Sequence, residues 1–344
     1  MKKEILIIAS EEDTHSAVVA WSLRKRGHNV TFLDTRLAMQ TQGNSVRIQN
    51  FSANEIYVLG KSNFYSAWLR RVPKVKSFND KTNPDDFEYI SRENDRYIDN
   101  LFELSAKSET RWLNDKKGCI WGEMKTEQLD ACRQLNVSFP DTLISNDPSM
   151  VRKFITEHGT VAVKPLDVYT WEREDESRLM TYTNTLSTNQ LATIGDDEIL
   201  ACPVIYQKLV KKTCDLRVAY VNGNYFACKI VNPNQDCIDF RPFQTDDTLL
   251  FEPYSPPEEI KNSLKKLCKH FNLTYASSDF CIDEDGKIYF LDLNPGGAFL
   301  FIEYHGAGSI TAHIASFLSG EPPEVFLGLH DYNDEMSKEL QVHA

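Results

Sequence analysis

The residues that suggest chemistry most strongly lie in one segment, residues 278–294. Asp285-Gly286 in the middle of this segment is a strong signal for a two-residue hairpin turn. If these two residues form the loop, counting outward along both strands places Asp279 directly opposite Asp292. Two carboxylates whose Cβ atoms are roughly 4.5–5.5 Å apart repel each other unless something neutralises them. The hairpin therefore predicts a carboxylate pair that needs a counter-charge.

A divalent cation would supply that counter-charge. Asn294 follows Asp292 by two residues, so strand alternation puts both side chains on one face and turns Leu291 and Leu293 towards a core. Two carboxylates and an amide oxygen form an all-oxygen ligand set suited to Mg²⁺ completed by nucleotide phosphates. The simpler alternative is that both aspartates are ordinary strand residues. The facing register and the Asn-Pro-Gly-Gly sequence at 294–297 favour the metal.

Two lysines could neutralise nucleotide phosphates. Lys164 lies at the end of an apolar strand predicted over residues 161–165, where its stem is partly buried and its ammonium needs a partner. A phosphate could be that partner, and a lysine that snorkels to the surface fits the position equally well. Lys125 enters a helix predicted over residues 124–135 and, taken alone, reads as an ordinary solvated side chain.

A strand that changes from apolar to polar residues could hold the adenine. Its backbone groups would meet the edge of the base over Gln207, Lys208, Leu209 and Val210. Three charged residues follow and could reach ribose, phosphate or substrate, namely Lys212, Asp215 and Arg217. Arg217 alternates with apolar neighbours and so points away from them, where it could face a cleft. An ion pair with Asp215 is the simpler alternative, and the two interpretations are compatible.

The elements that must position these groups begin with a βαβ unit over residues 4–34. Thr14 is the predicted N-cap of its helix and Gly27 the predicted C-cap. No GxGxxG sequence follows the first strand, and the acidic residues 11–13 would repel a pyrophosphate. A dinucleotide site is therefore not expected in this unit.

The later elements predict an α/β (α+β) chain of several units. Strands are expected over residues 204–210, 215–221 and 225–231, and helices over residues 148–158, 257–271 and 308–318, the last as a closing helix. We place an N-terminal α/β domain at 1–118, a central unit at 119–202, a C-terminal unit at 203–325 and a tail at 326–344.

Composition excludes several classes of protein. The 344 residues include 38 Lys and Arg against 50 Asp and Glu, a net charge of −12, without the basic block of a protein that tracks nucleic-acid phosphates. Apolar runs are too short to span a membrane, and no signal peptide is visible, so we expect a cytoplasmic protein that binds neither nucleic acid nor membrane. The eight cysteines form no CxxC pair, which indicates reduced structural thiols.

Taken together, these residues resemble the ATP-grasp ligases over nearly the whole chain. The resemblance rests on Lys164, on the hinge 207–210, on the Asp-Leu-Arg-Val sequence at 215–218, and on Asp279 with residues 292–294. Within that superfamily, the chain is similar to the macrocyclases that make microviridins and other graspetides. This closer likeness rests on residues 67–71, 142–146, 238–241 and 294–303. The resemblance implies a three-domain ATP-grasp architecture with an N-terminal βαβ pre-ATP-grasp domain.

The resemblance also implies ATP and Mg²⁺ as cofactors. The metal would be held by Asp279, Asp292 and Asn294, and the phosphates would be neutralised by Lys164 and Lys125. An Asp or Glu side chain would attack the γ-phosphate, and a Ser or Thr hydroxyl or a Lys amine would then attack the acyl phosphate, with Arg217 stabilising the developing charge.

The implied partner is a ribosomally made precursor peptide with a leader and an acidic core, and we also allow for a homodimer. The acidic core would be held by Arg70, Arg71, Arg217 and Arg241. Solvated surface arginines are the simpler explanation for Arg70, Arg71 and Arg241.

The chain departs from the family pattern at three places. Asp292 stands where the superfamily usually has Glu, residues 166–180 contain no glycine-rich phosphate loop, and residues 297–299 replace the Gly-Gln-Trp of the microviridin branch. The last difference favours another graspetide branch. Two alternatives stay open: a ligase of the glutamate-ligase type that joins separate molecules, and a catalytically silent nucleotide-binding or peptide-binding module.

Overall fold

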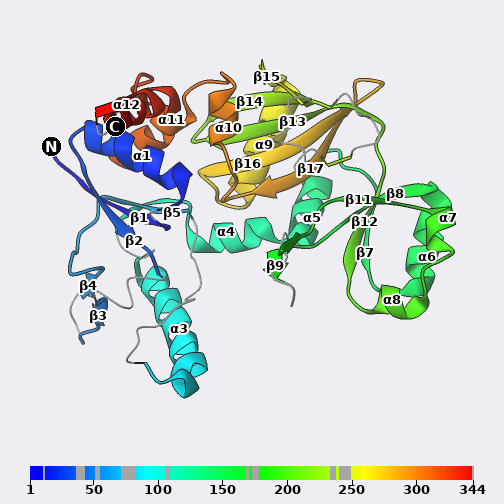
Figure 1. The fold of residues 1–344 in the computed structure, drawn as a ribbon, viewed down its shortest axis with the longest axis horizontal. Helices are drawn as coiled ribbons and strands as arrows, with labels where there is room; N and C mark the ends of the chain where they lie inside the picture. The colour runs from blue at the N-terminus through cyan, green and yellow to red at the C-terminus, as the bar shows by residue number, and fades with distance from the viewer. Residues whose placement is uncertain are drawn as a thin grey trace.

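The structure is a computed structural model that describes residues 1–10, 12–35, 43–50, 55–70, 82–105, 109–167, 170–172, 178–232, 238–239 and 249–342. Three sheets of four or five strands follow one another along the longest axis, with the five-stranded sheet in the middle (Figure 1). Helices cover these sheets, so the predicted α/β class is confirmed. None of the helices in the described ranges combines the length and apolar character needed to cross a bilayer.

The first sheet is parallel and contains the βαβ unit. Its strands, in spatial order, are β2 (Asn29–Leu33), β1 (Glu4–Ile8), β5 (Ser66–Leu69) and β6 (Arg111–Leu113). Helix α1 (Thr14–Lys25) connects β1 to β2. The N-cap is Asp13 and not the predicted Thr14, because the Asp13 carboxylate accepts a hydrogen bond from the Ser16 amide and Thr14 is already helical.

Smaller elements surround this sheet. They are the hairpin β3 (Ser45–Arg47) and β4 (Glu55–Tyr57), the 3₁₀ turn η1 (Pro84–Asp86), helix α3 (Phe87–Ser105) and helix α4 (Lys116–Glu123). Helix α4 leads from the first sheet towards the middle of the molecule (Figure 1). It is followed at once by α5 (Lys125–Leu135).

The second sheet is antiparallel. Its strands, in spatial order, are β11 (Asn184–Ser187), β8 (Thr160–Lys164), β12 (Val204–Lys208) and β7 (Thr142–Ser145). Helices α6 (Pro148–His158), α7 (Thr188–Leu191) and α8 (Asp196–Leu200) accompany it, as does the hairpin β9 (Thr170–Glu172) and β10 (Arg178–Met180). Strand β12 belongs to this sheet although it lies beyond the predicted boundary at residue 202, and the division into units stays a prediction.

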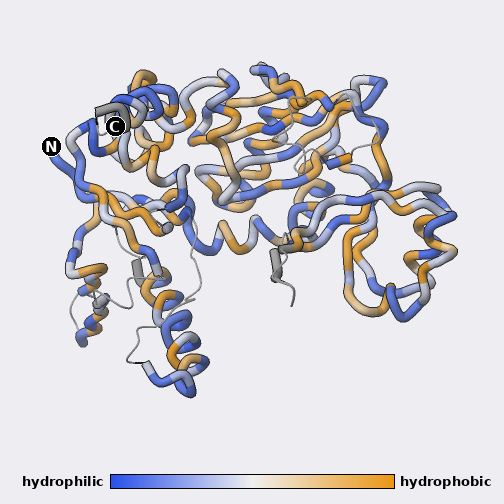
Figure 2. Tube along the Cα trace, viewed as in Figure 1, coloured by the Kyte–Doolittle hydropathy of each residue, from blue (hydrophilic) through white to orange (hydrophobic). Residues whose placement is uncertain are grey.

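The third sheet is antiparallel and has five strands. In spatial order they are β15 (Leu250–Tyr254), β14 (Asn224–Val231), β13 (Lys212–Val221), β16 (Tyr275–Asp283) and β17 (Ile288–Asn294). Helix α9 (Glu258–His270) packs on one face through Leu264 and Leu267. Figure 2 shows apolar stretches along these strands, as expected for a sheet that is covered.

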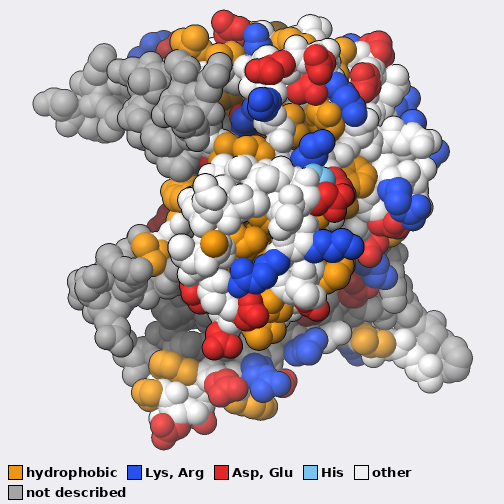
Figure 3. Space-filling model, turned by 90° about the vertical axis from the view of Figure 1, so that its right-hand side faces the viewer, with side chains coloured by type: hydrophobic (Ala, Val, Ile, Leu, Met, Phe, Trp, Pro, Cys, Tyr) orange, Lys and Arg blue, Asp and Glu red, His pale blue; other side chains and the backbone are white. Residues whose placement is uncertain are grey.

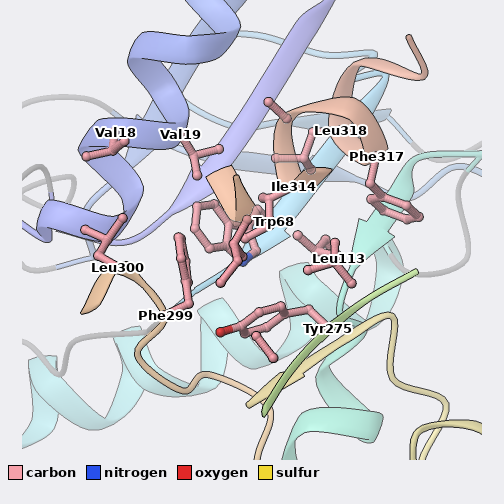
Figure 4. Close-up of a cluster of buried hydrophobic side chains, with 14 of the residues drawn as sticks. Val18, Val19, Trp68, Leu113, Tyr275, Phe299, Leu300, Ile314, Phe317 and Leu318 are labelled. Atoms are coloured by element: carbon pink, nitrogen blue, oxygen red, sulfur yellow. The ribbon is translucent and has the colours of Figure 1, made fainter. Parts of the chain in front are cut away.

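The C-terminal segment returns to the first sheet. It forms α10 (Leu300–Tyr304), α11 (Ile310–Ser319) and α12 (Leu329–Val342), so most of the predicted tail is helical. Trp21 of α1 packs edge-on against Tyr332 of α12, and Lys25 lies 2.6 Å from Glu335. Figure 4 shows the resulting core, in which α1, β5 and α11 contribute Val19, Trp68 and Ile314.

Acidic and basic side chains are interspersed on the end of the molecule that carries the second sheet. Figure 3 shows Lys and Arg beside Asp and Glu over this face, without a block of one sign. One of these mixed contacts is the ion pair of Arg152 with Asp196, 2.7 Å apart.

Candidate active site

The predicted carboxylate pair forms on β16 and β17. Asp279 lies opposite Asp292, as predicted, and Ser277 lies opposite Asn294. The predicted two-residue turn is wrong, because the Asp283 amide donates to the Lys287 carbonyl at 3.0 Å and leaves a loop of three residues. Gly286 closes this loop with a φ of 79°, a conformation that glycine adopts without strain.

A second irregularity restores the predicted register. The pairing shifts between Asp279 and Phe280, so that Phe280 faces Phe290 and Leu291 is an extra residue on β17. This bulge offsets the longer loop. It also explains why Leu293 is fully buried whereas Leu291, predicted to point into the core, is only half-buried.

Each carboxylate of the pair is bonded to a cation from another element. Arg217 of β13 donates from Nη1 to Oδ2 of Asp279 at 2.7 Å, and Lys125 of α5 donates from Nζ to Oδ1 of Asp292 at 2.5 Å. Burial alone would lower the pKa of Arg217, but the ion pair with Asp279 outweighs it and raises the pKa. The two facing carboxylates, which would repel each other, are therefore each paired with one cation.

The oxygen atoms of this site fit a magnesium ion. The Asp279 and Asp292 side chains keep 28% and 35% of their surface exposed, and the cations engage one oxygen of each. Across the described ranges, no three His, Cys, Asp or Glu side chains form a group that could hold a metal. The site offers two carboxylates and the amide of Asn294, one carboxylate fewer than such a group needs. This ligand set suits a cation whose remaining ligands come from phosphates and water.

Lys164 lies at the end of β8 and faces this site. Its Nζ donates to Oε1 of the buried Gln207 at 2.6 Å, and Gln207 donates in turn to Thr142 Oγ1 at 2.9 Å. Burial lowers the pKa of Lys164, and the nearby Asp292 carboxylate opposes that shift. The snorkelling alternative does not describe this side chain, because its ammonium ends on a buried amide.

The predicted hinge connects the second and third sheets. Strand β12 ends at Lys208 and β13 begins at Lys212. Gln207 is paired with a strand on each side, and the Lys208 amide donates to the Asp141 carbonyl at 2.8 Å. The backbone groups of Gln207 and the Lys208 amide are thus engaged in the sheet, and the half-buried Leu209 and Val210 follow outside it.

Lys212 and Asp215 form an ion pair of their own. Lys212 Nζ lies 2.6 Å from Asp215 Oδ2 and also donates to the Ile238 carbonyl at 2.8 Å. Burial raises the pKa of Asp215, although Lys212 opposes the shift. The alternative pair between Arg217 and Asp215 does not form, because Arg217 faces Asp279 on the neighbouring strand.

Arg70, one of the predicted substrate ligands, lies against the loop that follows β17. Its side chain is fully buried, donates from Nη1 to the carbonyls of Gly296 and Gly297, and lies 3.6 Å from Asp13. Burial would raise the pKa of Asp13, but Arg70 and the Ser16 amide hold it below its usual value. In this arrangement the Arg70 guanidinium contacts protein groups, and its predicted role in binding substrate stays a prediction. Arg71 and Arg241 lie outside the described residues.

Three buried polar side chains that the sequence did not single out hold the end of β17 and the loop after it. Gln128 bonds to both backbone groups of Leu293, Asn114 donates to the Pro295 carbonyl, and Tyr275 donates to the Gly297 carbonyl. The only hint in the sequence is that Gln128 follows Lys125 by three positions, which puts both on one face of a helix.

The cysteine thiols near the site stay protonated and are therefore poor nucleophiles. Burial raises the pKa of Cys281 to about 12, and that of Cys132 likewise to about 12. The cysteines within the described ranges are unpaired with one another, as predicted for reduced structural thiols. A thiolate nucleophile is therefore not part of the chemistry proposed below.

A cavity of about 840 Å³ lies away from this site, beside β4, β5 and β6. Tyr65 and Trp112 line it, together with Arg111. None of its lining residues belongs to the predicted nucleotide or metal site.

Comparison with known proteins identifies the fold. No family model matches the sequence, and no curated protein sequence matches it. A Chryseobacterium gregarium RiPP-associated ATP-grasp ligase, solved with ADP and a leader and core peptide, is 21% identical. It superposes with a TM-score of 0.81 over 94% of this chain and 98% of that one. The chain has the ATP-grasp fold.

Two further ATP-grasp structures agree. Macrocyclase MdnC from Microcystis aeruginosa, bound to precursor peptide MdnA, is 22% identical with a TM-score of 0.77, and the match covers 92% of this chain and all of that one. ATP-grasp ligase PsnB, solved with a minimal precursor, Mg and ADP, is 23% identical with a TM-score of 0.72 over 92% and 96% of the two chains. The ATP-grasp fold thus spans nearly the whole chain.

Proposed function

We propose that this protein is an ATP-dependent carboxylate ligase that closes rings in a ribosomally made precursor peptide in the cytoplasm. The observation that carries the proposal is the convergence of Asp279, Asp292 and Asn294 with Lys125, Lys164 and Arg217 from separate elements. This convergence occurs on a fold whose solved examples include complexes with ADP, Mg and precursor peptides. An enzyme, and not a silent binding module, is favoured because the charged groups are all present.

The nucleotide would lie between the second and third sheets. Asp279, Asp292 and Asn294 would hold Mg²⁺, which supplies positive charge to the phosphates when bound. Lys164 would exchange Gln207 for a phosphate oxygen, and Lys125 would move from Asp292 to a phosphate in the same way. Leu209 and Val210 would offer backbone groups to the adenine.

The chain's own residues would then serve two transfers. In the first, a substrate carboxylate oxygen bonds to the γ-phosphorus as the bond to ADP breaks. In the second, a Ser or Thr hydroxyl or a Lys amine attacks the acyl carbon, phosphate leaves, and the nucleophile loses its proton. Arg217 is buried, stays charged and lies beside the carboxylate pair, so it can stabilise the oxyanion that forms.

The substrate would be a precursor peptide with a leader and an acidic core. The MdnC and Chryseobacterium structures contain precursor or leader and core peptides, which supports this class. Arg217, with Arg71 and Arg241, would receive core carboxylates. We reassign Arg70 to holding the loop at Gly296 and Gly297, because its guanidinium is engaged there.

The test is a reconstituted reaction with ATP, Mg²⁺ and a candidate precursor peptide, sought in the gene neighbourhood as a short open reading frame with Thr, Ser or Lys and Asp or Glu in its core. We expect products lighter by one water per bond, because each ring closes with loss of water, measured as intact mass. Replacing the acceptor Thr, Ser or Lys of the peptide should abolish the corresponding loss. A gain equal to one amino acid would establish an intermolecular ligase instead, and a protein that consumes no ATP would be a silent module.

Lys164→Met should weaken ATP binding while leaving the thermal stability of the free protein nearly unchanged. Methionine keeps most of the apolar stem and removes the charge that would meet a phosphate. Calorimetric titration of ATP into both proteins measures the difference. Lys153→Met on the exposed face of α6 is the control and should bind ATP as the wild type does. Equal affinities for wild type and Lys164→Met would remove Lys164 from the nucleotide site.

A further inference from the structure

Gln128 makes an unusual set of contacts for a helix side chain. It is 1% exposed, donates from Nε2 to the Leu293 carbonyl at 2.7 Å, and accepts at Oε1 from the Leu293 amide at 3.0 Å. A third bond joins Nε2 to the Gly122 carbonyl at 2.7 Å. One buried amide thus satisfies both backbone groups of a single strand residue.

That strand residue separates two of the proposed metal ligands. Leu293 lies between Asp292 and Asn294, and β17 is the edge strand of its sheet. On the inner side, the Ser278 hydroxyl donates to the Asp292 carbonyl at 2.7 Å. On the outer side no further strand of the described residues pairs with β17, and beside Leu293 Gln128 takes the place that a strand would occupy.

The turn from α4 into α5, the helix that carries Gln128, packs closely against the end of β17. A Cβ atom at Gly122 would lie 3.1 Å from Pro295, which follows β17, and 3.2 Å from Leu273, closer than ordinary van der Waals contact. Lys125 lies one turn before Gln128 and bonds to Asp292. Helix α5 therefore contacts the proposed ligands twice, once through a side-chain ion pair and once through the backbone between them.

We propose that Gln128 is a positioning residue for the metal site. The inference rests on the proposed function, since it assigns Asp292 and Asn294 as ligands. By fixing the peptide plane on each side of Leu293, Gln128 keeps the Asp292 and Asn294 side chains in fixed positions on one face of β17. It never touches the metal, and its effect passes through the backbone of β17. Partners of this kind typically change metal affinity by about 10- to 100-fold when removed.

The test is Gln128→Met, which keeps the length of the side chain and removes all three hydrogen bonds. Mn²⁺ serves as the probe, and its free concentration is followed by electron paramagnetic resonance in the presence of ADP. We expect Mn²⁺ to bind about 10- to 100-fold more weakly, while ADP affinity without metal stays at the wild-type value. Gln134→Met is the matched control on α5, because the Gln134 side chain bonds to Asp130 at the surface. It should bind Mn²⁺ normally.

Each outcome bears on one claim. Wild-type Mn²⁺ affinity in a folded Gln128→Met protein overturns the positioning role and leaves the proposed ligase intact. If that variant does not fold, Gln128→Glu, which keeps an acceptor for the Leu293 amide but loses the two donated bonds, takes its place in the same titration. Wild-type Mn²⁺ affinity there has the same meaning. A wild-type protein that binds no Mn²⁺ with ADP would remove the metal site itself, and with it both proposals.

Discussion

Asp292→Asn is expected to lower peptide cyclisation by at least about 100-fold, the loss typical of removing one electrostatic catalytic group. The substitution is nearly isosteric, so the fold should persist. It removes one of the two facing carboxylates, and with it part of the negative charge that would hold Mg²⁺. It also removes the ion pair that positions Lys125. Turnover is measured by intact mass of the peptide, and thermal unfolding checks the fold.

Glu284→Gln in the exposed loop of the same hairpin is the control for this experiment. It also removes one negative charge from the hairpin, but at a position that touches neither Lys125 nor Arg217 in the described structure. It should cyclise the peptide at the wild-type rate. An Asp292→Asn protein with normal turnover and a normal response to Mg²⁺ would show that the carboxylate pair is not the metal site.

Arg217→Ala is expected to reduce ring formation by about 10²- to 10³-fold, the range found when a preorganised donor to an oxyanion is removed. Nucleotide binding should be largely retained, because Lys164 and the hinge, and not Arg217, face the phosphates and base in our assignment. Single-turnover experiments separate these effects, with ATP affinity measured by titration and bond formation by peptide mass.

The contact of Arg217 with Asp279 makes the companion variant Arg217→Lys informative. A lysine preserves the positive charge beside Asp279 and loses the fork of donors, so its rate should fall between those of wild type and Arg217→Ala. If Arg217→Ala closes rings at the wild-type rate, the oxyanion role is wrong even though the ATP-grasp fold stands.

The sequence predicted the carboxylate pair correctly, but by a count that contained two errors of opposite sign. The loop at residues 284–286 is one residue longer than expected, and Leu291 adds one residue on the returning strand. Nothing in the local sequence distinguishes a two-residue turn at Asp285-Gly286 from a three-residue loop closed by Gly286. The alternation of side chains along a strand predicts which residues share a face over a few positions, but this prediction fails at a bulge.

The partners of the charged residues could not be predicted. Lys125 and Asp292 are 167 positions apart, and Arg70 reaches a loop 226 positions away. Taken alone, Lys125 read as solvated and Arg70 as a surface or substrate-binding residue. Their positions follow from how the sheets pack, which periodicity does not encode. The hinge at residues 207–210, by contrast, was predicted from the resemblance to the ATP-grasp ligases, because the change from apolar to polar residues is by itself a weak signal.

The helix α12 was missed for a related reason. Its sequence is largely polar, and its contact with α1 depends on Trp21 and Lys25, far away along the chain. A polar helix gains most of its stability from what it packs against. Without that partner in view, residues 326–344 resembled a tail.

The return of the chain to its first sheet has a consequence for folding on the ribosome. Ser66 of β5 donates to the Leu318 carbonyl at 2.6 Å, and Arg111 of β6 lies over the ring of Phe317. The first sheet emerges early during synthesis, but the helix that covers this part of it is made some 200 residues later. Until then its apolar face is open to solvent or to chaperones. Nascent chains stalled before residue 300 should therefore be digested within residues 4–113 by protease, whereas the released 344-residue chain should resist.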